Sequence, residues 1–158
     1  MPKENQFCVI ELDSLSWPVA LRVPSARFRL FVAVDATGTS TEAISEFAEA
    51  ALNNGMVYLC AWGPDCSRLH DIVDLVVVDD DLGKRLFVRP SEDDTIMTTW
   101  HESDTLTEAL DFFVNCAFPT DGFETDSHYW VALCVNNLEW AAVIRQQLED
   151  AEFSTNEE

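Results

Sequence analysis

Short segments rich in β-forming residues alternate along the chain with segments whose apolar residues recur every three or four positions. Most of the first kind are almost continuously apolar, which is typical of strands buried on both faces of a sheet. A shorter apolar stretch at 7–12 is typical of an edge strand. The segments that predict the strands of the main sheet are 28–34, 56–62, 75–78, 95–100 and 129–135.

The first helix is predicted directly after the first of these strands. Thr39 and Glu42 have the spacing of a capping box, in which two side chains satisfy free backbone N–H groups of the first turn. The apolar residues that follow share one helical face, and Gly55 can end the helix in a left-handed conformation. A shorter helix is predicted from Cys66 to about Val73.

Two more helices are predicted in the C-terminal half. Thr105 and Glu108 have the spacing of a second capping box, and Pro119 ends the helix that follows. Asn136 or Asn137 is expected to cap the last helix. The two predicted inner faces consist of Leu106, Ala109, Leu110, Phe113, Val114 and Ala117, and of Leu138, Ala141, Ile144 and Leu148.

Strands that alternate with helices predict a parallel sheet with helices on both faces. The expected fold class is therefore α/β, a three-layer flavodoxin-like or Rossmann-like sandwich with about five mostly parallel strands and about four helices. Residues 79–94 are largely polar and interrupt the alternation, so an antiparallel edge is expected there. We divide the chain into an N-terminal arm packed on the domain (1–26), a single domain (27–150) and a frayed acidic tail (151–158).

The carboxyl ends of the strands are the expected place for a ligand, because open parallel sheets bind ligands outside that edge. This rule gathers four loops onto one rim, at 35–40, 62–66, 100–104 and 136–137. A bound ligand would require a pocket between the ends of the first two strands of the main sheet. The candidate ligand-binding residues are Thr37, Gly38, Thr39, Ser40, Trp62 and Trp100.

The hydroxyl-rich turn from Asp35 to Thr41 has two interpretations. It leads into a helix N-terminus, where backbone N–H groups and hydroxyls can cradle a phosphate. Ser and Thr also cap helices, and the carboxylate of Asp35 would repel an anion, so capping is favoured. The turn has one glycine and no lysine after it, which excludes the Walker and dinucleotide-binding patterns.

The run Thr37-Gly38-Thr39-Ser40-Thr41-Glu42 resembles the phosphate loop of flavodoxins, and Thr99-Trp100 is similar in type to the aromatic residue beside their flavin. The resemblance implies a flavin at the rim. The loop has one residue too many between Gly38 and Thr41, however, and the glycine-rich loops around the flavin ring are missing. We therefore favour no cofactor, and a flavin- or nucleotide-binding domain is an alternative.

Four residues on the same rim carry side chains suited to catalysis: Asp35, Asp65, Cys66 and His101. A helix N-terminus would favour a Cys66 thiolate, whereas the neighbouring Asp65 disfavours it. His101 could act as a general base oriented by a nearby carboxylate. His70 is one turn from Cys66, but two ligands do not make a metal site, and no metal is expected. A structural role is favoured for Cys66, and a solvated or turn-capping role for His101.

The composition sets limits on partners. The chain has 158 residues, of which 47% are hydrophobic, so it can build the core of one domain. Lys and Arg number 9 against 29 Asp and Glu, a net charge of -20. This charge disfavours nucleic acid and anionic membranes, and it would attract a basic partner protein. No apolar run is long enough to span a membrane, and the polar start does not resemble a signal peptide.

The 5 cysteines indicate reduced thiols and a cytoplasmic location, because most lie in apolar runs and their number is odd. Trp17 is expected to pack the N-terminal arm on the domain. The sequence also resembles an uncharacterised bacterial family of small acidic α/β domains over about 27–150, which implies a bacterial origin and an α/β fold but no activity. The segments that carry this resemblance are 60–66 (CAWGPDC), 97–101 (MTTWH), 115–119 (NCAFP) and 139–141 (EWA).

Taken together, these patterns favour a non-enzymatic protein-interaction module of the inhibitor, immunity or adaptor type. Its acidic surface would meet a basic protein. The first alternative is a nucleotide- or flavin-binding domain with its ligand at the carboxyl rim. The second is a small hydrolase or transferase that uses the four candidate catalytic residues. The oligomeric state stays open.

Overall fold

The computed structural model describes residues 5–79, 94–124 and 126–155. The described residues form one sheet of five strands, and all neighbouring strands are parallel. The elements along the chain are β1 (Gln6–Leu12), β2 (Phe28–Ala33), the 3-10 helix η1 (Ala36–Gly38), α1 (Thr41–Asn53), β3 (Met56–Trp62), α2 (Cys66–Asp79), β4 (Met97–Trp100), α3 (Leu106–Asn115), α4 (Asp121–Glu124), β5 (Tyr129–Val135) and α5 (Leu138–Thr155).

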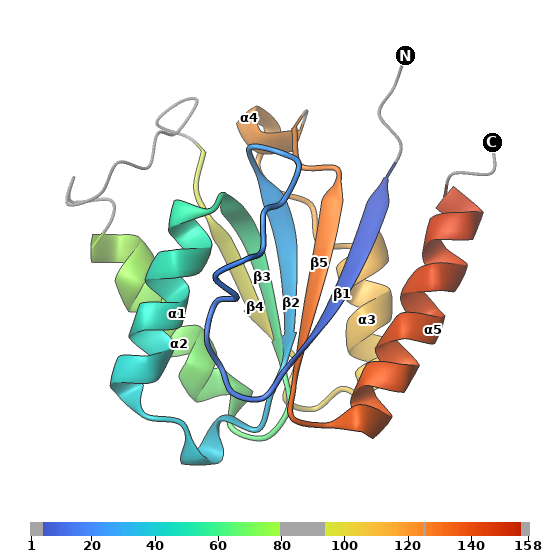
Figure 1. The fold of residues 1–158 in the computed structure, drawn as a ribbon. Helices are drawn as coiled ribbons and strands as arrows, with labels where there is room; N and C mark the ends of the chain where they lie inside the picture. Colours follow the sequence, from blue (N-terminus) through green and yellow to red (C-terminus); the bar gives the residue numbers. More distant parts are fainter. Residues whose placement is uncertain (1–4, 80–93, 125, 156–158) are drawn as a thin grey trace.

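Helices cover both faces of the sheet, which confirms the predicted three-layer α/β sandwich (Figure 1). α1 and α2 pack together on one face, and α3 and α5 pack together on the other. Alternate residues of β2 serve the two cores: Leu30 and Val32 belong to the core with α1 and α2, whereas Phe31 and Ala33 belong to the core with α3 and α5. The two-residue period of a strand thus divides one apolar run between two layers.

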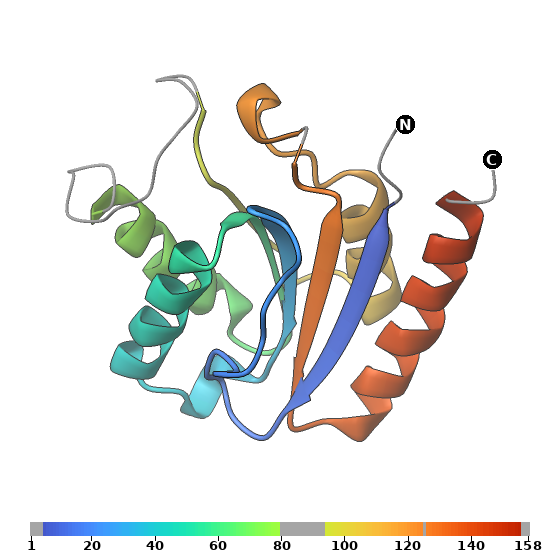
Figure 2. The ribbon, with the colours of Figure 1, turned by 45° about the horizontal axis from the view of Figure 1, so that its top comes forward.

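The sheet order is β1-β5-β2-β3-β4. If β2 is counted as the first strand, the segment β4-β3-β2-β5 has the relative order 3-2-1-4 of doubly wound dinucleotide-binding folds. The flavodoxin order is 2-1-3-4-5, so the strand order favours the Rossmann-like of the two predicted alternatives. β1 takes the place beyond β5, at the edge of the sheet (Figure 2).

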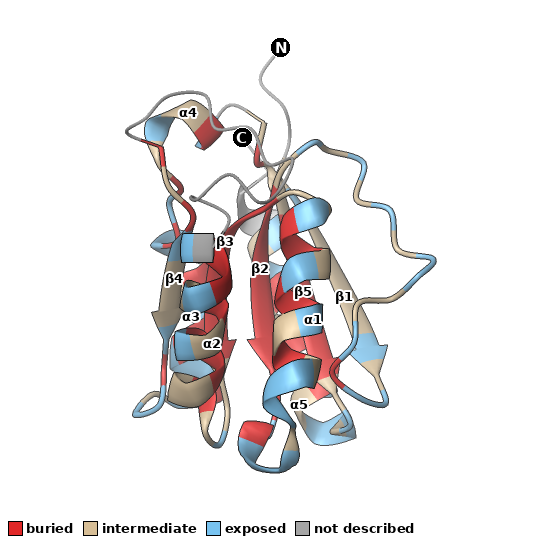
Figure 3. Ribbon diagram, turned by 90° about the vertical axis from the view of Figure 1, so that its left-hand side faces the viewer, coloured by how far each residue is buried: buried red, intermediate tan, exposed pale blue. Residues whose placement is uncertain are grey.

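The central strands are the buried ones (Figure 3). Every residue of β2 is buried, and so is every residue of β3 except Trp62. β1 and β4 are only partly buried because each has a single neighbouring strand. The continuous apolar runs of the sequence therefore mark the interior of the sheet, and the prediction of an edge strand at 7–12 is confirmed.

The connection from β1 to β2 is long and contains no helix. Its Trp17 ring lies 5.6 Å from the ring of Phe28 and 6.1 Å from that of Phe47, which confirms that Trp17 packs this segment on the domain. Leu15 is buried in the same core. These contacts hold the segment that follows β1 against β2 and α1.

The predicted strand at Leu75–Val78 is wrong, because these residues form the last turns of α2. Val76 and Val77 face the core there, while Leu75 and Val78 are exposed. The number of strands is still five because β1 joins the sheet in its place. The expected antiparallel edge is wrong for the described sheet, since β4 pairs with β3 in parallel. The polar interruption lies almost entirely at 80–93, outside the described residues.

The helices differ from the predictions in three further respects. The N-cap of α1 is Ser40 instead of Thr39, so the first predicted capping box does not form. The second one does form, with Thr105 and Glu108 as predicted. A short helix, α4, lies between α3 and β5, where no helix was predicted, and α5 continues through 151–155, where fraying was expected.

Candidate functional site

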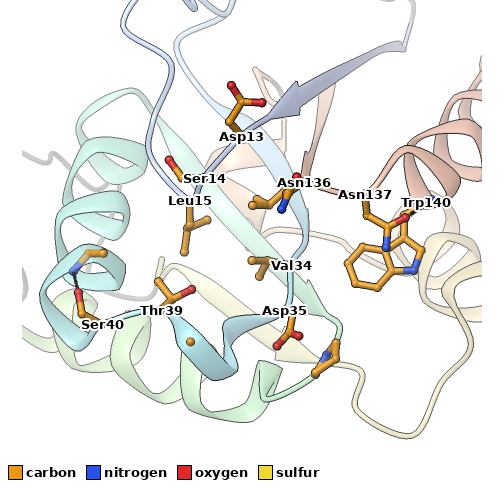
Figure 4. A pocket seen from close by; sticks show the side chains of 14 residues that line it. Asp13, Ser14, Leu15, Val34, Asp35, Thr39, Ser40, Asn136, Asn137 and Trp140 are labelled. Carbon is orange, nitrogen blue, oxygen red and sulfur yellow. Dashed lines mark hydrogen bonds between the residues drawn. The ribbon is translucent and has the colours of Figure 1, made fainter.

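The strand order places a crevice at the carboxyl ends of β2 and β5. These two strands are neighbours, but α1 follows β2 on one face of the sheet and α5 follows β5 on the other. Where successive connections leave to opposite faces, a doubly wound sheet opens a space that commonly holds a ligand. The crevice found there has a volume of about 660 Å³ (Figure 4).

This crevice has an apolar interior and a polar border. Leu15 and Val34 are apolar lining residues that the protein itself buries almost fully, and the partly exposed Trp140 contributes apolar surface. Side-chain hydroxyl, amide and carboxyl groups surround them. The residues that supply these polar groups are Asp13, Ser14, Asp35, Thr39, Ser40, Asn136 and Asn137.

The turn between β2 and α1 forms one side of the crevice. Asp35 accepts a hydrogen bond from the N–H of Thr37 at 3.0 Å, and Ser40 accepts one from the N–H of Ala43 at 3.1 Å. These contacts confirm that Asp35 and Ser40 cap η1 and α1. The side chain of Thr39 is turned toward the crevice, where its hydroxyl can meet a ligand.

The turn between β5 and α5 forms the opposite side. Asn136 has a φ of 50°, a left-handed conformation that asparagine tolerates better than most residues. Its N–H donates to the carbonyl of Leu12 at 2.7 Å, which ties this turn to the end of β1. Asn137 accepts the N–H of Trp140 at 3.0 Å and is therefore the cap of α5. The two asparagines thus present amide groups from a fixed turn.

The end of β1 supplies a third side of the crevice, which was not predicted from the sequence. Asp13, Ser14 and Leu15 line the crevice, although the sequence placed them in an irregular arm. The expected pocket between the ends of β2 and β3 is also displaced. Its centre lies between β2 and β5, and only Pro64 represents the end of β3. A parallel β1 puts its carboxyl end on the same rim, which is the signal that could have predicted this side.

The two tryptophans proposed as ligand-binding residues lie outside the crevice lining. The Trp62 indole N–H donates to the carbonyl of Asp104 at 2.9 Å, and the Trp62 ring meets the Trp140 ring edge-on at 4.9 Å. Trp100 lies on β4 and packs on the ring of His70 at 4.4 Å. Of the other candidates, Gly38, Thr39 and Ser40 line the crevice, and Thr37 is exposed beside it.

Of the four candidate catalytic residues, only Asp35 lines the crevice. Asp65 is 3.8 Å from the guanidinium of Arg68, and the thiol of Cys66 lies against the backbone N–H of His101. Cys66 is fully buried, and burial raises the pKa of its thiol. A buried thiol of raised pKa is a poor nucleophile at neutral pH. The ring of His101 hydrogen-bonds to other partners.

His101 lies in a line of three side chains at the end of β4. Its Nε2 is 2.9 Å from the hydroxyl of Thr99, and its Nδ1 is 2.9 Å from a carboxylate oxygen of Asp104. A hydroxyl, an imidazole and a carboxylate in this order are the groups of a nucleophilic triad. Thr99 and His101 are outside the crevice lining, so the triad has no substrate space in common with it.

A similar line occurs on the other side of β4. Thr98 is 3.0 Å from Nε2 of His70, and Nδ1 of His70 is 3.0 Å from Asp71. Successive residues of a strand face opposite sides of the sheet, so each threonine joins β4 to a different neighbour. The two lines of hydrogen bonds attach the short edge strand β4 to the residues on either side of it.

In the part of the chain that the structure describes, no group of three or more His, Cys, Asp or Glu side chains is arranged to hold a metal ion. Among the described helices, none combines the length and apolar character that crossing a membrane requires.

The fold and the crevice define a doubly wound α/β domain with a candidate ligand site at its topological switch point. The chain belongs to a family described as a domain of unknown function, DUF7684, whose model matches residues 8–151. No curated protein matches the chain, and no solved structure does.

Proposed function

We propose that this chain is a small-molecule-binding domain whose ligand occupies the crevice between β2 and β5. The observation that carries the proposal is the position of the crevice, at the switch point where doubly wound sheets hold their ligands. Its volume of about 660 Å³ lies within the range of small-molecule sites. The proposal places the domain in the cytoplasm of a bacterium, and the 5 free cysteines support a reducing compartment.

The residues that line the crevice also support ligand binding. The partly exposed Trp140 ring gives a ligand apolar surface to cover, and the hydroxyl and amide groups around the crevice can fix the ligand's orientation. The turns that carry these groups are held by their own capping bonds. A ligand would therefore meet groups that are already in place, which lowers the entropic cost of binding.

Blocking the crevice tests the proposal. Thr39→Trp places an indole in the lining, whereas Thr37→Trp makes the same change at an exposed position just outside it. We would titrate the ¹⁵N-labelled protein with four probes that share an aromatic ring: benzylamine, benzyl alcohol, benzoate and phenyl phosphate. Adenosine and flavin mononucleotide complete the set, because nucleotide and flavin ligands are the earlier alternatives.

At least one probe is expected to shift the backbone amides of Asp35, Thr39 and Asn136 in a saturable way. Thr39→Trp should abolish these shifts, and Thr37→Trp should retain them. The proposal is overturned if no probe shifts these amides, or if the blocked variant binds as well as the unaltered protein.

A second candidate function is the interaction with a basic protein, and the exposed residues around β4 favour it. Trp100 is 50% exposed and Met97, also on β4, is 36% exposed, which is unusual for large apolar side chains. Asp71 and Asp74 lie around the His70 ring on which Trp100 packs. An apolar edge next to carboxylates is complementary to a partner with both basic and apolar side chains.

Affinity purification from the source cells at low and high salt tests this candidate. Trp100→Ser removes the aromatic side chain at β4, and Phe118→Ser removes an exposed aromatic side chain elsewhere. A basic partner should remain with the unaltered protein and with Phe118→Ser, and should be lost with Trp100→Ser or at high salt. Equal recovery by both variants would contradict a site at β4.

A further inference from the structure

The crevice is acidic, and its lining suggests the charge of its ligand. Among the described residues, the lining contains two carboxyl groups, Asp13 and Asp35, and no Lys or Arg side chain. Hydrogen bonds from Thr37 hold the pKa of Asp35 below its usual range, so its carboxylate is ionised at neutral pH. The two acids lie on different sides of the space in Figure 4, Asp35 beside η1 and Asp13 at the end of β1.

Arg68 is a cation next to this rim, and its guanidinium is engaged by other groups. One nitrogen of the Arg68 guanidinium donates to the carbonyl of Ala36 at 3.0 Å, and another donates to the hydroxyl of Thr41 at 3.2 Å. The same guanidinium is 3.8 Å from Asp65. Arg68 therefore connects α2 to the start of α1, and Asp65 partly neutralises its charge. Arg68 does not belong to the crevice lining.

The two carboxyl groups in the lining, without a lining cation among the described residues, argue against an anionic ligand. A phosphate at the start of α1 would gain from the helix dipole, but it would lie beside the carboxylate of Asp35 without a lining cation to offset the repulsion. The net charge of -20 adds to that repulsion at longer range. The phosphate-bearing nucleotides and flavins are thus the least suitable ligands for this lining.

We infer that the crevice takes an organic ammonium ligand, a protonated amine or guanidine attached to an apolar body. The inference rests on the proposed binding function and names its ligand class. The carboxylate of Asp35 meets the cationic group, and the amides of Asn136 and Asn137 accept its remaining N–H donors. The apolar body lies against the partly exposed Trp140 ring, which gives the site both charge and shape.

The four aromatic probes test this charge preference, because they differ mainly in charge. In 150 mM salt, benzylamine is expected to bind at least about tenfold more tightly than benzoate or phenyl phosphate, judged by the shifts of the crevice amides. Asp35→Asn keeps an oxygen that can accept the Thr37 N–H but loses the charge. It should weaken benzylamine binding about two- to fivefold and leave benzyl alcohol unchanged.

Asp111→Asn is the matched control. Asp111 is an exposed carboxyl on α3 that also accepts one side-chain hydrogen bond, from Asn115. This variant changes the net charge equally and should leave benzylamine binding as it is. An equal loss in both variants would assign the preference to the overall charge and overturn the inference.

The other outcomes separate the inference from the function on which it rests. If benzyl alcohol, benzoate or phenyl phosphate binds the crevice as tightly as benzylamine, the binding function stands and the ammonium ligand is wrong. If magnesium chloride displaces benzylamine in a manner that depends on Asp35, the crevice is a metal site and the inference is also wrong. If no probe shifts the crevice amides, both proposals fail.

Discussion

Cys60 shows how a single buried side chain links the fold to pH. It lies on β3 in the core with α3 and α5, and it is fully buried. Burial raises the pKa of its thiol from 9.0 to about 12, although the hydroxyl of Thr99, 3.5 Å away, partly opposes this by donating to the sulfur. The folded protein therefore holds this proton to a higher pH than the unfolded chain does.

Stability should consequently fall as the pH rises above 9. Unfolding releases the proton of Cys60 in this range, so the contribution of the thiol is complete below pH 9 and is lost toward pH 12. Between pH 8 and 10 we expect this thiol alone to account for about 1 kcal/mol of the loss. Urea unfolding at several pH values should show a smaller fall for Cys60→Ala than for the unaltered protein.

The choice of pH range and control isolates this effect. Burial lowers the pKa of Arg29 to about 10, which changes stability in the opposite sense above that pH, so the comparison ends at pH 10. Cys116 is exposed and is the smallest cause of the raised pKa of Cys60, so Cys116→Ala should keep most of the fall. An identical pH dependence in Cys60→Ala and the unaltered protein would contradict the assigned role of burial.

At the scale of elements, the connection from β3 to α2 depends on one glycine. Gly63 has a φ of 119°, and a Cβ atom there would lie 2.1 Å from the carbonyl oxygen of Val34. Both the left-handed conformation and the close approach exclude a side chain. The connection can pass over the end of β2 only because this residue is glycine, and it brings Pro64 to the crevice.

Gly63→Ala should lower the free energy of unfolding by more than about 2 kcal/mol, because the backbone must move to relieve the contact. Gly38 gives the matched control, since a Cβ atom built there meets nothing within 4 Å and its φ is outside the left-handed range. Gly38→Ala should change stability by less than about 0.5 kcal/mol. Equal effects of the two substitutions in urea unfolding would show that the packing at Gly63 is not as tight as described.

Periodicity predicted most elements, and it failed where burial overrode local preference. The β-branched run at 75–78 has the composition of a strand, but it continues the apolar face of α2. Composition cannot distinguish a short buried strand from the end of a helix, since both place consecutive apolar residues against a core. β1 completes the five-stranded sheet, and the sequence predicted it only as an edge strand beside the main sheet.

The sequence predicted only part of the candidate site, because it predicts where strands end but not which strands are neighbours. The carboxyl-end rule correctly gathered the turns at 35–40 and 136–137, because it needs only the strands. The order of the strands decides which ends are neighbours, and that order depends on long-range packing. Trp62 and Trp100 were therefore grouped with the turns, although Trp62 packs on Trp140 and Trp100 lies on the edge strand.

For the whole molecule, charge is the dominant property that the sequence already determines. Acidic side chains outnumber basic ones 29 to 9, and few of them are buried among the described residues. The folded state gathers these charges into a small volume, so their mutual repulsion opposes folding. The same field that would attract an ammonium ligand or a basic partner thus has a cost in stability.

Salt should therefore stabilise the fold. Raising sodium chloride from 10 mM to 1 M shortens the screening length from about 30 Å to about 3 Å, which removes most of the repulsion between exposed carboxylates. We expect the midpoint of thermal unfolding at pH 7 to rise by several degrees, equivalent to about 1–2 kcal/mol. Potassium chloride should give the same rise, because screening depends on ionic strength and not on the identity of the cation. A rise with only one of the two salts would indicate specific ion binding, and an unchanged midpoint would show that the carboxylates are too far apart to repel one another appreciably.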